Sequence, residues 1–386
     1  MNFYNLKHKE EQLNFKEATI KGQGKDKGLF FPEDISKFSN EFLQNLPNLS
    51  NEEIAFQVMK DFAGDEIPEA ELRKIVAETI AFEIPLKKVT ENISVLELFH
   101  GPTLAFKDVG ARFMSRCLGY FLKNETRKVT VLVATSGDTG GAVANGFYDV
   151  EGIEVVILYP KNRVSPVQEK QLTALGKNIH ALEVNGSFDD CQALVKQAFS
   201  DESLTEKLLL TSANSINVAR WLPQQIYYVL ALKQWLKIHS ENPVICVPSG
   251  NFGNICAGIL AHHRGLPVEH FIAACNVNDV VPEYLRTEIL QPKETVATIS
   301  NAMDVGDPSN FVRILELFDK EFNQVKNKLS GYTIDDEETL KTIKRVEKDY
   351  GYVLDPHGAV AFVALEKYLA ENGGKGFFLE TAHPVK

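Results

Sequence analysis

The sequence lacks most features that mark secreted, metal-binding or membrane proteins. Its five cysteines are scattered, and no two form a Cys-x-x-Cys pair, so we expect no metal site and no redox motif. An odd and sparse cysteine count is typical of a reducing compartment. The sequence has no run of roughly 18 apolar residues, and its polar start, Met1 to Glu11, lacks the apolar core of a signal peptide. We therefore expect a cytoplasmic protein that does not act on membranes.

Positive charge is also in short supply. Lysine and arginine number 41 against 52 aspartate and glutamate, so the formal net charge is −11, and no basic block is present. Proteins that bind nucleic acid usually carry a basic patch or stripe, so we expect no nucleic-acid partner. Hydrophobic residues make up 44% of the chain, which is ordinary for a globular protein. At roughly 150 residues per domain, 386 residues predict two or three domains.

The pattern of apolar residues divides the chain into three parts. Residues 1–91 are predicted to form a mostly helical region. Further along, apolar β-branched runs alternate with helical patterns, which indicates parallel βαβ units with buried strands. A long helical pattern over Asn217–His239 separates two groups of strands, so we expect α/β domains at 92–225 and 226–386. The predicted strands are Val129–Ala134, Glu154–Tyr159, His180–Val184, Val244–Val247, Phe271–Cys275 and Phe377–Leu379. Capping boxes are expected at Ser50 with Glu53 and at Ser165-Pro166 with Gln168.

Three polar or glycine-rich segments stand out because open α/β sheets bind ligands at the carboxyl ends of their strands. The segments Ala134–Gly141 and Val247–Asn254 each follow a strand and open a helix, a place where backbone N–H groups can hold an anion. A tight turn would need only one glycine and a cap. The second segment is neither a Walker loop nor a dinucleotide fingerprint, so a terminal phosphate group suits it better.

The third segment, His100–Asp108, places Lys107 directly after an apolar Leu-Ala-Phe triplet. A lysine beside a hydrophobic wall can have a lowered pKa and so become an amine nucleophile. Taken alone, Lys107 could equally be a surface lysine at a helix start. Together with a phosphate cup, an amine nucleophile indicates a pyridoxal 5'-phosphate enzyme.

These residues resemble the threonine synthase family, which belongs to the fold-type-II pyridoxal-phosphate enzymes. The matching segments, in the family's order, are Gly28–Pro32, Glu97–Asp108, Thr135–Gly140, Ala213–Asn217, Pro248–Gly253, Ser300–Val305 and Thr381–Pro384. They span nearly the whole chain, and the stretch that ends at Lys107-Asp108 is specific to this family among its relatives. The resemblance implies two parallel-sheet α/β domains with the cofactor in the cleft between them.

The resemblance also implies an activity. The implied reaction is that of a carbon–oxygen lyase acting on phosphate: O-phospho-L-homoserine and water become L-threonine and phosphate by γ-elimination and then β-addition. This is the last step of threonine biosynthesis. Another fold-type-II lyase, such as a threonine dehydratase, and a catalytically silent homologue are the alternatives. The sequence leaves both a monomer and a homodimer open.

Individual roles follow from the same resemblance. Lys107 matches the catalytic Schiff-base lysine, Thr381 the hydroxyl that meets the pyridine nitrogen, and Asp138 the residue beside the cofactor's phenolic oxygen. The residues expected to hold the cofactor phosphate are Ser249, Gly250, Asn251, Phe252, Gly253 and Asn254. Those expected to bind the substrate carboxylate are Thr135, Ser136 and Thr139, and those expected to bind the substrate phosphate are Asn214, Ser215 and Arg220.

Asp138 departs from the asparagine that many fold-type-II relatives carry at this position. A carboxylate would repel a phenolate oxygen, so Asp138 is expected either to be protonated or to point elsewhere. Thr381 also has a chemical consequence. A hydroxyl does not hold the ring nitrogen protonated as a carboxylate would, which is expected to limit unwanted chemistry at Cα.

Overall fold

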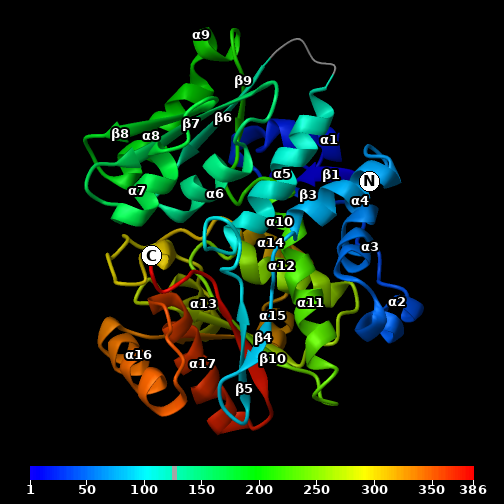
Figure 1. Cartoon of the computed structure of the whole chain (residues 1–386), viewed down its shortest axis with the longest axis vertical. Coiled ribbons are helices and arrows are strands. Elements are labelled where there is room, and N and C mark those ends of the chain that lie inside the picture. Colours follow the sequence, from blue (N-terminus) through cyan, green and yellow to red (C-terminus); the bar gives the residue numbers. More distant parts are fainter. Residues whose placement is uncertain (124–127) are drawn as a thin grey trace.

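Two parallel sheets form the frame of the molecule, one in the upper and one in the lower half of Figure 1. The computed structural model describes residues 1–123 and 128–386. The upper sheet has four strands in the order β8-β7-β6-β9, and all of its pairs are parallel. Its strands are β6 (Val129–Ala134), β7 (Ile153–Pro160), β8 (Ile179–Val184) and β9 (Leu209–Ser212). The helices that connect them are α6 (Asp138–Gly146), α7 (Pro166–Thr173), α8 (Phe188–Ser200) and α9 (Glu202–Thr205).

The lower sheet has six strands in the order β12-β11-β10-β13-β5-β4, of which only the edge strand β4 runs antiparallel to its neighbour. Its strands are β4 (Leu86–Lys88), β5 (Ile93–Glu97), β10 (Val244–Pro248), β11 (His270–Cys275), β12 (Leu329–Thr333) and β13 (Gly376–Glu380). The two parallel sheets and the six strands expected from the sequence are thus confirmed. The central strands β10, β11, β13 and β5 are buried along their whole length, as expected for strands covered on both faces.

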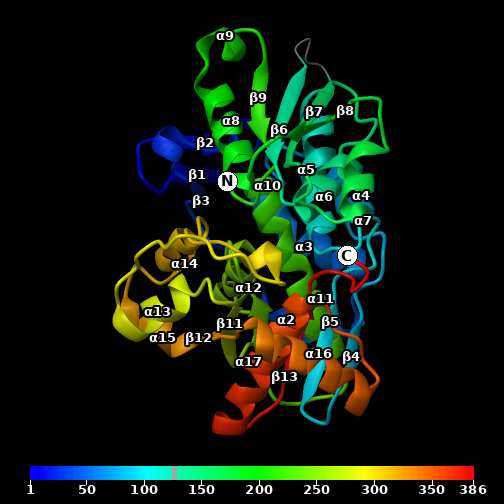
Figure 2. The ribbon, with the colours of Figure 1, turned by 90° about the vertical axis from the view of Figure 1, so that its left-hand side faces the viewer.

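Helices cover both sheets and fill the space between them (Figures 1 and 2). They are α5 (Lys107–Phe121), α10 (Val218–Trp221), α11 (Gln225–Trp235), α12 (Gly253–His263), α13 (Val280–Thr287), α14 (Phe311–Leu317), α15 (Phe322–Lys328), α16 (Asp336–Tyr350) and α17 (Pro356–Asn372). The helical pattern over 217–239 is interrupted by a 3-10 turn, Leu222–Gln224, because Pro223 cannot donate an intrahelical hydrogen bond.

The N-terminal region packs along both halves, with α4 against α5 and α3 against α11. Its helices are α1 (Phe15–Lys21), α2 (Asn40–Asn45), α3 (Asn51–Ala63) and α4 (Glu69–Thr79). It also contains a three-stranded antiparallel sheet that the sequence pattern did not indicate. The strands of that sheet are β1 (Asn2–Asn5), β2 (Gln12–Asn14) and β3 (Phe30–Pro32). The boundaries 1–91, 92–225 and 226–386 stay a prediction, although β5 lies within the second range and pairs with the sheet of the third.

The two expected capping boxes have different outcomes. At α7 the box is complete, because Ser165 and Gln168 each accept a hydrogen bond from the other's backbone N–H. At α3, Ser50 Oγ accepts from Glu53 N at 3.1 Å, but the reciprocal bond is replaced. The Glu53 carboxylate instead forms an ion pair with Arg73 at 2.7 Å. The expectation of a full capping box at Ser50 was therefore wrong in its second half.

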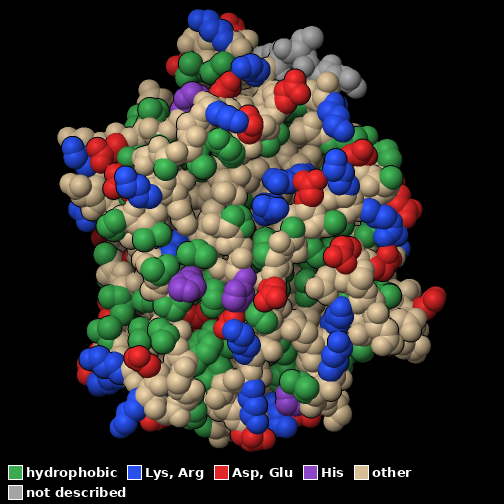
Figure 3. Space-filling view, viewed as in Figure 1, with side chains coloured by type: hydrophobic (Ala, Val, Ile, Leu, Met, Phe, Trp, Pro, Cys, Tyr) green, Lys and Arg blue, Asp and Glu red, His purple; other side chains and the backbone are tan. Residues whose placement is uncertain are grey.

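The surface fits the charge balance of the sequence. On the face shown in Figure 3, basic and acidic side chains are interspersed rather than gathered in a patch of one sign. All five cysteines are free thiols buried in the core. Within residues 1–123 and 128–386, no helix has the length and apolar composition needed to cross a membrane.

Candidate active site

The strand order of the lower sheet brings three distant segments to one edge. β13 lies between β10 and β5, so the loops that follow these three parallel strands leave the same edge of the sheet. Ala105 and Ala382 form an isolated β-bridge, and Phe106 N donates to Thr381 O at 2.9 Å. The backbone of Thr381 is therefore fixed directly beside the segment that carries Lys107.

Lys107 is the first residue of α5 and keeps a partly accessible side chain. Burial among the surrounding residues lowers the pKa of its amine, Asp138 opposes that effect, and the cations Lys386 and Arg220 add to it. A lowered pKa raises the fraction of neutral amine at pH 7, which is the form that attacks a carbonyl carbon. Lys107 thus has the environment of an amine nucleophile.

The loop from Pro248 to Asn254 has the shape of an anion cradle. Gly250 lies so close to the neighbouring backbone that an added Cβ would be 2.6 Å from Met303 Cα. Phe252 caps α12 in the left-handed region, with φ 61°, a costly conformation for an aromatic residue. The first N–H groups of α12 have no intrahelical acceptor and are free to bind an anion.

Asn254 gives a direct sign that this cradle fits a phosphate group. Its Oδ1 accepts hydrogen bonds from Tyr227 and Tyr228 at 2.7 and 2.6 Å, which leaves its Nδ2 as the group that faces away from them. That Nδ2 is buried and has no hydrogen-bond partner. A buried donor without an acceptor is unfavourable, and a phosphate oxygen would satisfy it. The residues of the loop therefore fit the cofactor that the sequence predicts.

The cofactor loop is joined to the segment expected to receive the substrate phosphate. Asn251 Nδ2 donates to Ser215 Oγ at 2.9 Å. Ser249 points inward instead, and its Oγ donates to Val247 O at 2.8 Å. Ser215 follows β9 of the upper sheet and Asn251 follows β10 of the lower sheet, so this hydrogen bond links the two halves of the molecule.

Arg220 is a buried cation without a carboxylate partner among the described residues. It is 3% exposed, its Nη1 donates to Ala213 O, and its Nε has no partner. Burial lowers the pKa of its guanidinium to about 10, so it is charged at neutral pH. A Cβ on Gly110, in the helix that begins at Lys107, would be 3.1 Å from that Nε. The positive charge thus lies beside the helix of the predicted nucleophile. Asn214, expected in the same group, is partly exposed in the adjoining turn.

The loop expected to bind the substrate carboxylate follows β6. Thr135 is 1% exposed, and its hydroxyl oxygen accepts from the backbone N–H groups of Gly137 and Gly140 at 2.9 and 2.8 Å. Gly137 has φ 138°, which no L side chain adopts readily. Thr135 therefore shapes the loop, and the partly exposed Ser136 and Thr139 are the side chains open to a ligand.

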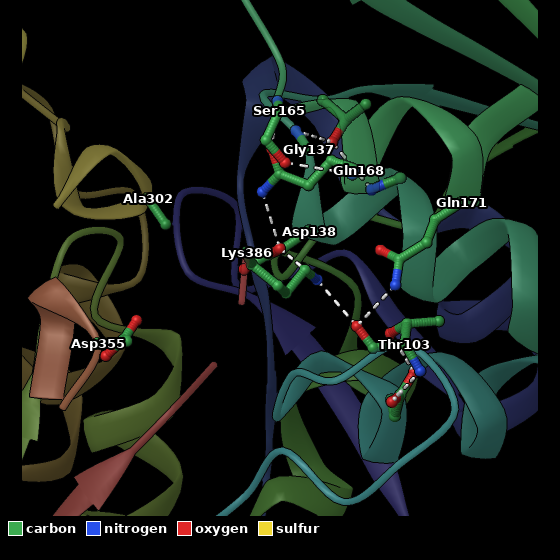
Figure 4. A network of polar contacts seen from close by, with 12 residues as sticks. Thr103, Gly137, Asp138, Ser165, Gln168, Gln171, Ala302, Asp355 and Lys386 are labelled. Carbon is green, nitrogen blue, oxygen red and sulfur yellow. Dashed lines mark hydrogen bonds and ion pairs between the residues drawn. The ribbon is translucent and has the colours of Figure 1, made fainter. Parts of the chain in front are cut away.

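Asp138 forms the ion pair at the centre of Figure 4. Lys386 Nζ lies 2.5 Å from Asp138 Oδ1 and donates to Thr103 O at 2.8 Å, and Gln168 Nε2 donates to Asp138 at 3.0 Å. Burial alone would raise the pKa of Asp138, but Lys107, Lys386 and these hydrogen bonds lower it to about 2. The carboxyl group is therefore ionised, and of the two possibilities drawn from the sequence, protonation does not apply.

Several residues at this site carry no signal in the sequence pattern. Lys386 lies far from Asp138 along the chain, and the pattern around Gln168 indicates only a helix cap. His357 stands in none of the motifs: its Nδ1 contacts Asp355 Oδ2 at 2.6 Å and its Nε2 accepts from Ala302 N at 3.2 Å. The Asp355-Pro356 pair that caps α17 is the one local feature that could have drawn attention to it.

Two histidines that flank the site motifs lie in a neighbouring cavity. His100 and His383 help to line a space of about 410 Å³ together with Glu97 and Tyr352. His100 contacts the buried Glu97 carboxylate at 2.6 Å, and Tyr352 donates to the same carboxylate at 3.0 Å. These contacts hold the edge of β5 in place, and no contact of either histidine with Lys107 is present in the described residues.

Comparison with known proteins gives a consistent result over the whole chain. Residues 2–80 match the family described as threonine synthase N terminus, and residues 80–377 match the family described as pyridoxal-phosphate dependent enzyme. The chain is 48% identical to threonine synthase of Haemophilus influenzae over 386 residues, which is 100% of this chain and 89% of the relative. The crystal structure of threonine synthase from Escherichia coli matches with a TM-score of 0.93 at 47% identity and covers 100% of this chain and 89% of that one. The structure of a pyridoxal-phosphate-bound threonine synthase from Brucella melitensis matches with a TM-score of 0.93 at 35% identity, with the same coverage.

Proposed function

The chain belongs to the threonine synthase family of pyridoxal-phosphate-dependent enzymes, and we propose that it converts O-phospho-L-homoserine and water to L-threonine and phosphate. One observation carries the choice of substrate. Arg220 is a buried, charged guanidinium that has an unpartnered Nε and no carboxylate partner among the described residues. A buried charge of this kind is stabilised by an anionic ligand, and a planar guanidinium suits a phosphate group. Threonine and serine, the substrates of a dehydratase, carry no phosphate group for this guanidinium to bind.

Three anionic groups are bound in this proposal: the cofactor phosphate, the substrate phosphate and the substrate carboxylate. The cofactor phosphate is held by the turn from Ser249 to Asn254, with Asn254 Nδ2 as one donor. The substrate phosphate is held by Arg220, Ser215 and Asn214, and the substrate carboxylate by Ser136, Thr139 and backbone N–H groups of the loop shaped by Thr135. The contact between Asn251 and Ser215 supports this arrangement because it joins the two phosphate-binding turns.

Proton transfer is the task of Lys107. Pyridoxal phosphate, when bound, supplies an electron sink for negative charge that develops at Cα. With the cofactor bound, the free Lys107 amine would take the proton from Cα. It holds only one extra proton at a time, so it would pass that proton to the bound cofactor before it takes one from Cβ, which lets phosphate leave from Cγ. The lowered pKa of this amine supports a role as base near neutral pH. Lys107 would then return one proton to Cγ and one to Cα, while water adds its hydroxyl at Cβ and gives its remaining proton to the released phosphate.

Thr381 and Asp138 control the surroundings of the cofactor. Thr381 is 6% exposed and is fixed by the hydrogen bond from Phe106 N to its carbonyl oxygen, so its hydroxyl is available to meet the ring nitrogen. Asp138 is ionised and paired with Lys386, so the phenolic oxygen would face an ion pair with no net charge rather than an unpaired carboxylate.

The test is an assay of the purified protein reconstituted with pyridoxal phosphate. With O-phospho-L-homoserine, we expect phosphate and threonine in equal amounts, and Lys107→Ala should abolish both products together with borohydride labelling of the wild-type lysine. Lys341→Ala, at an exposed position on α16, serves as the matched control and should behave as wild type. Formation of 2-oxobutyrate from L-threonine without phosphate release would indicate a dehydratase. A protein that neither binds the cofactor nor forms products would be a silent homologue.

The same proposal places the enzyme in the cytoplasm. Five free, buried thiols are typical of a protein that folds in a reducing compartment. Cell fractionation with an antibody to the chain checks this, and recovery in the membrane or secreted fraction would contradict it. Sedimentation of the purified protein would decide between a monomer and a homodimer.

A further inference from the structure

Arg313 in α14 is a second buried arginine near the phosphate-binding turns, and neither the sequence pattern nor the proposed function uses it. Its side chain is fully buried, and among the described residues no carboxylate pairs with it. Burial lowers the pKa of its guanidinium to about 9, so the group is still charged at neutral pH. A buried and uncompensated cation is costly, which raises the question of what holds it there.

The guanidinium is held by acceptors from three separate segments. Its Nη2 donates to Phe30 O at 2.9 Å and to Ile216 O at 2.7 Å, and its Nη1 donates to Asn310 Oδ1 at 2.8 Å. Its planar face lies 4.3 Å from the ring centroid of Trp221. Arg313 thus fixes β3 and the turn that contains Ser215 against the start of its own helix.

The contact with Asn310 fixes the orientation of that side chain. A guanidinium has donors only, so the amide oxygen of Asn310 must face Arg313 and the amide nitrogen must face away. That nitrogen, Nδ2, lies 3.3 Å from Ser215 Oγ. Asn310 is fully buried, so water does not compete for either end of its amide. Arg313 therefore determines that Asn310 donates to Ser215.

A second amide donates to the same hydroxyl oxygen. Asn251 Oδ1 accepts from the backbone N–H and the hydroxyl of Ser309, each at 2.7 Å, so its Nδ2 must face Ser215 Oγ at 2.9 Å. A serine oxygen has two lone pairs, and both are now occupied. The one hydrogen-bonding group that Ser215 has left is its own O–H, which can only donate. Its side chain is partly exposed, so that O–H can reach a ligand.

We propose that Arg313 is a positioning residue that acts through Asn310 to make the Ser215 hydroxyl an obligate donor, and so selects a substrate with a fully ionised phosphate group. This inference rests on the proposed function, in which Ser215 binds the substrate phosphate. The polarity matters because a hydroxyl that is free to rotate accepts or donates equally well. One that can only donate binds an oxyanion most strongly, and it cannot accept a hydrogen bond from a ligand that presents its own O–H, such as an unphosphorylated amino alcohol.

The decisive variant is Asn310→Asp, which changes one nitrogen to oxygen and keeps the partner of Arg313. One carboxylate oxygen still accepts from Arg313, while the other now accepts the Ser215 O–H and withdraws it from the ligand. We expect the KM for O-phospho-L-homoserine to rise about tenfold or more, the range for losing a hydrogen bond to a charged group, with a smaller change in kcat. Inorganic phosphate binding to the cofactor-loaded protein, measured by titration calorimetry, should weaken by a similar factor.

The contacts that run from Arg313 through Asn310 to Ser215 are called the relay below. Two controls separate this relay from simpler explanations. In a Ser215→Ala background, Asn310→Asp should weaken phosphate binding little further, because the hydroxyl that Asn310 orients is absent. An equally large loss of phosphate affinity there would mean that the new carboxylate repels phosphate directly, and it would overturn the proposal. Arg313→Lys should raise the KM, whereas Arg264→Lys should not. Arg264 is equally buried but pairs with Asp61 in a separate part of the molecule, so both variants perturb a buried cation.

The outcomes also distinguish this proposal from the function on which it rests. If wild type does not turn over O-phospho-L-homoserine but does bind inorganic phosphate, and Asn310→Asp weakens that binding, the proposed function fails and the relay stands. If Asn310→Asp leaves both the KM and phosphate binding within twofold of wild type while the protein is folded and carries its cofactor, the relay is refuted. A wild-type protein that does not bind phosphate refutes it as well.

Discussion

Replacing Lys386 with methionine should destabilise the protein most strongly at neutral pH. The change keeps the length of the side chain and removes its charge, which leaves the Asp138 carboxylate, 8% exposed, without its ion-pair partner at 2.5 Å. The pKa of Asp138 is about 2 in the folded protein against an ordinary 3.8, and a difference of nearly two units corresponds to about 2.5 kcal/mol. Removing one partner of a buried pair costs about 3–5 kcal/mol. Since Lys107 still faces the carboxylate, we expect a loss of about 2–4 kcal/mol at pH 7.

The stability difference between wild type and Lys386→Met should depend on pH. Because the folded pKa of Asp138 lies below the unfolded value, the pair in wild type contributes fully above about pH 4 and is lost as the pH falls through about 2. Without Lys386, the pKa of Asp138 rises, and the carboxyl group takes up a proton as the pH is lowered. The difference in stability between wild type and Lys386→Met should therefore be largest at pH 7 and shrink toward pH 4.

Urea unfolding of the cofactor-loaded proteins, followed by circular dichroism at pH 7 and pH 4, measures this difference. Lys341→Met is the matched control, since Lys341 has an ion pair with Glu337 at the same distance, 2.5 Å, but on the exposed surface, and should lose little stability. Adding Asp138→Asn to Lys386→Met should restore part of the loss, because no unpaired charge is then buried. The reasoning fails if Lys386→Met loses no more stability than Lys341→Met, or if the double variant is less stable than the single one.

Three further predictions concern single positions. Gly250→Ala would place a Cβ 2.6 Å from Met303 Cα, so the loop must shift. We expect the affinity for pyridoxal phosphate, titrated into the apo-protein, to fall about 5- to 150-fold, the equivalent of about 1–3 kcal/mol of overpacking. An unchanged affinity would show that the loop can relax. Gly358→Ala would overlap Glu380 Oε2, a fully buried carboxyl oxygen, so the urea midpoint should drop, and a wild-type midpoint would mean that Glu380 can move aside. Thr381→Asp should raise side reactions such as transamination, measured as keto-acid formed per threonine, and an unchanged ratio would contradict the role proposed for the hydroxyl.

Local patterns in the sequence predicted the elements of the fold well. The strands at 129–134 and 377–379, and the helix expected to open at the segment Val247–Asn254, lie where the alternation of apolar runs and helical patterns placed them. Each of these depends on residues that are neighbours along the chain. The N-terminal sheet was missed because its strands are three or four residues long, too short to show an alternation.

The candidate site divides in the same way. Lys107 and the turn from Ser249 to Asn254 could be predicted because each is identified by residues that are consecutive in the sequence. The charge state of Asp138 could not, because it depends on Lys386, and the two residues meet only when the chain returns between the two sheets (Figures 1 and 2). The relay from Arg313 to Ser215 is likewise invisible in the sequence, since a buried arginine and a surface arginine look the same there.

The sequence by itself therefore determined which residues can do chemistry and which element each one begins or ends. Tertiary structure decided which of them meet. The reason is the order of strands in the lower sheet: β13, the last strand of the chain, enters between β10 and β5, and only this order sets Thr381 beside Lys107 and the phosphate loop. Backbone hydrogen bonds between strands fix that order, and no local pattern records with which strand another will pair.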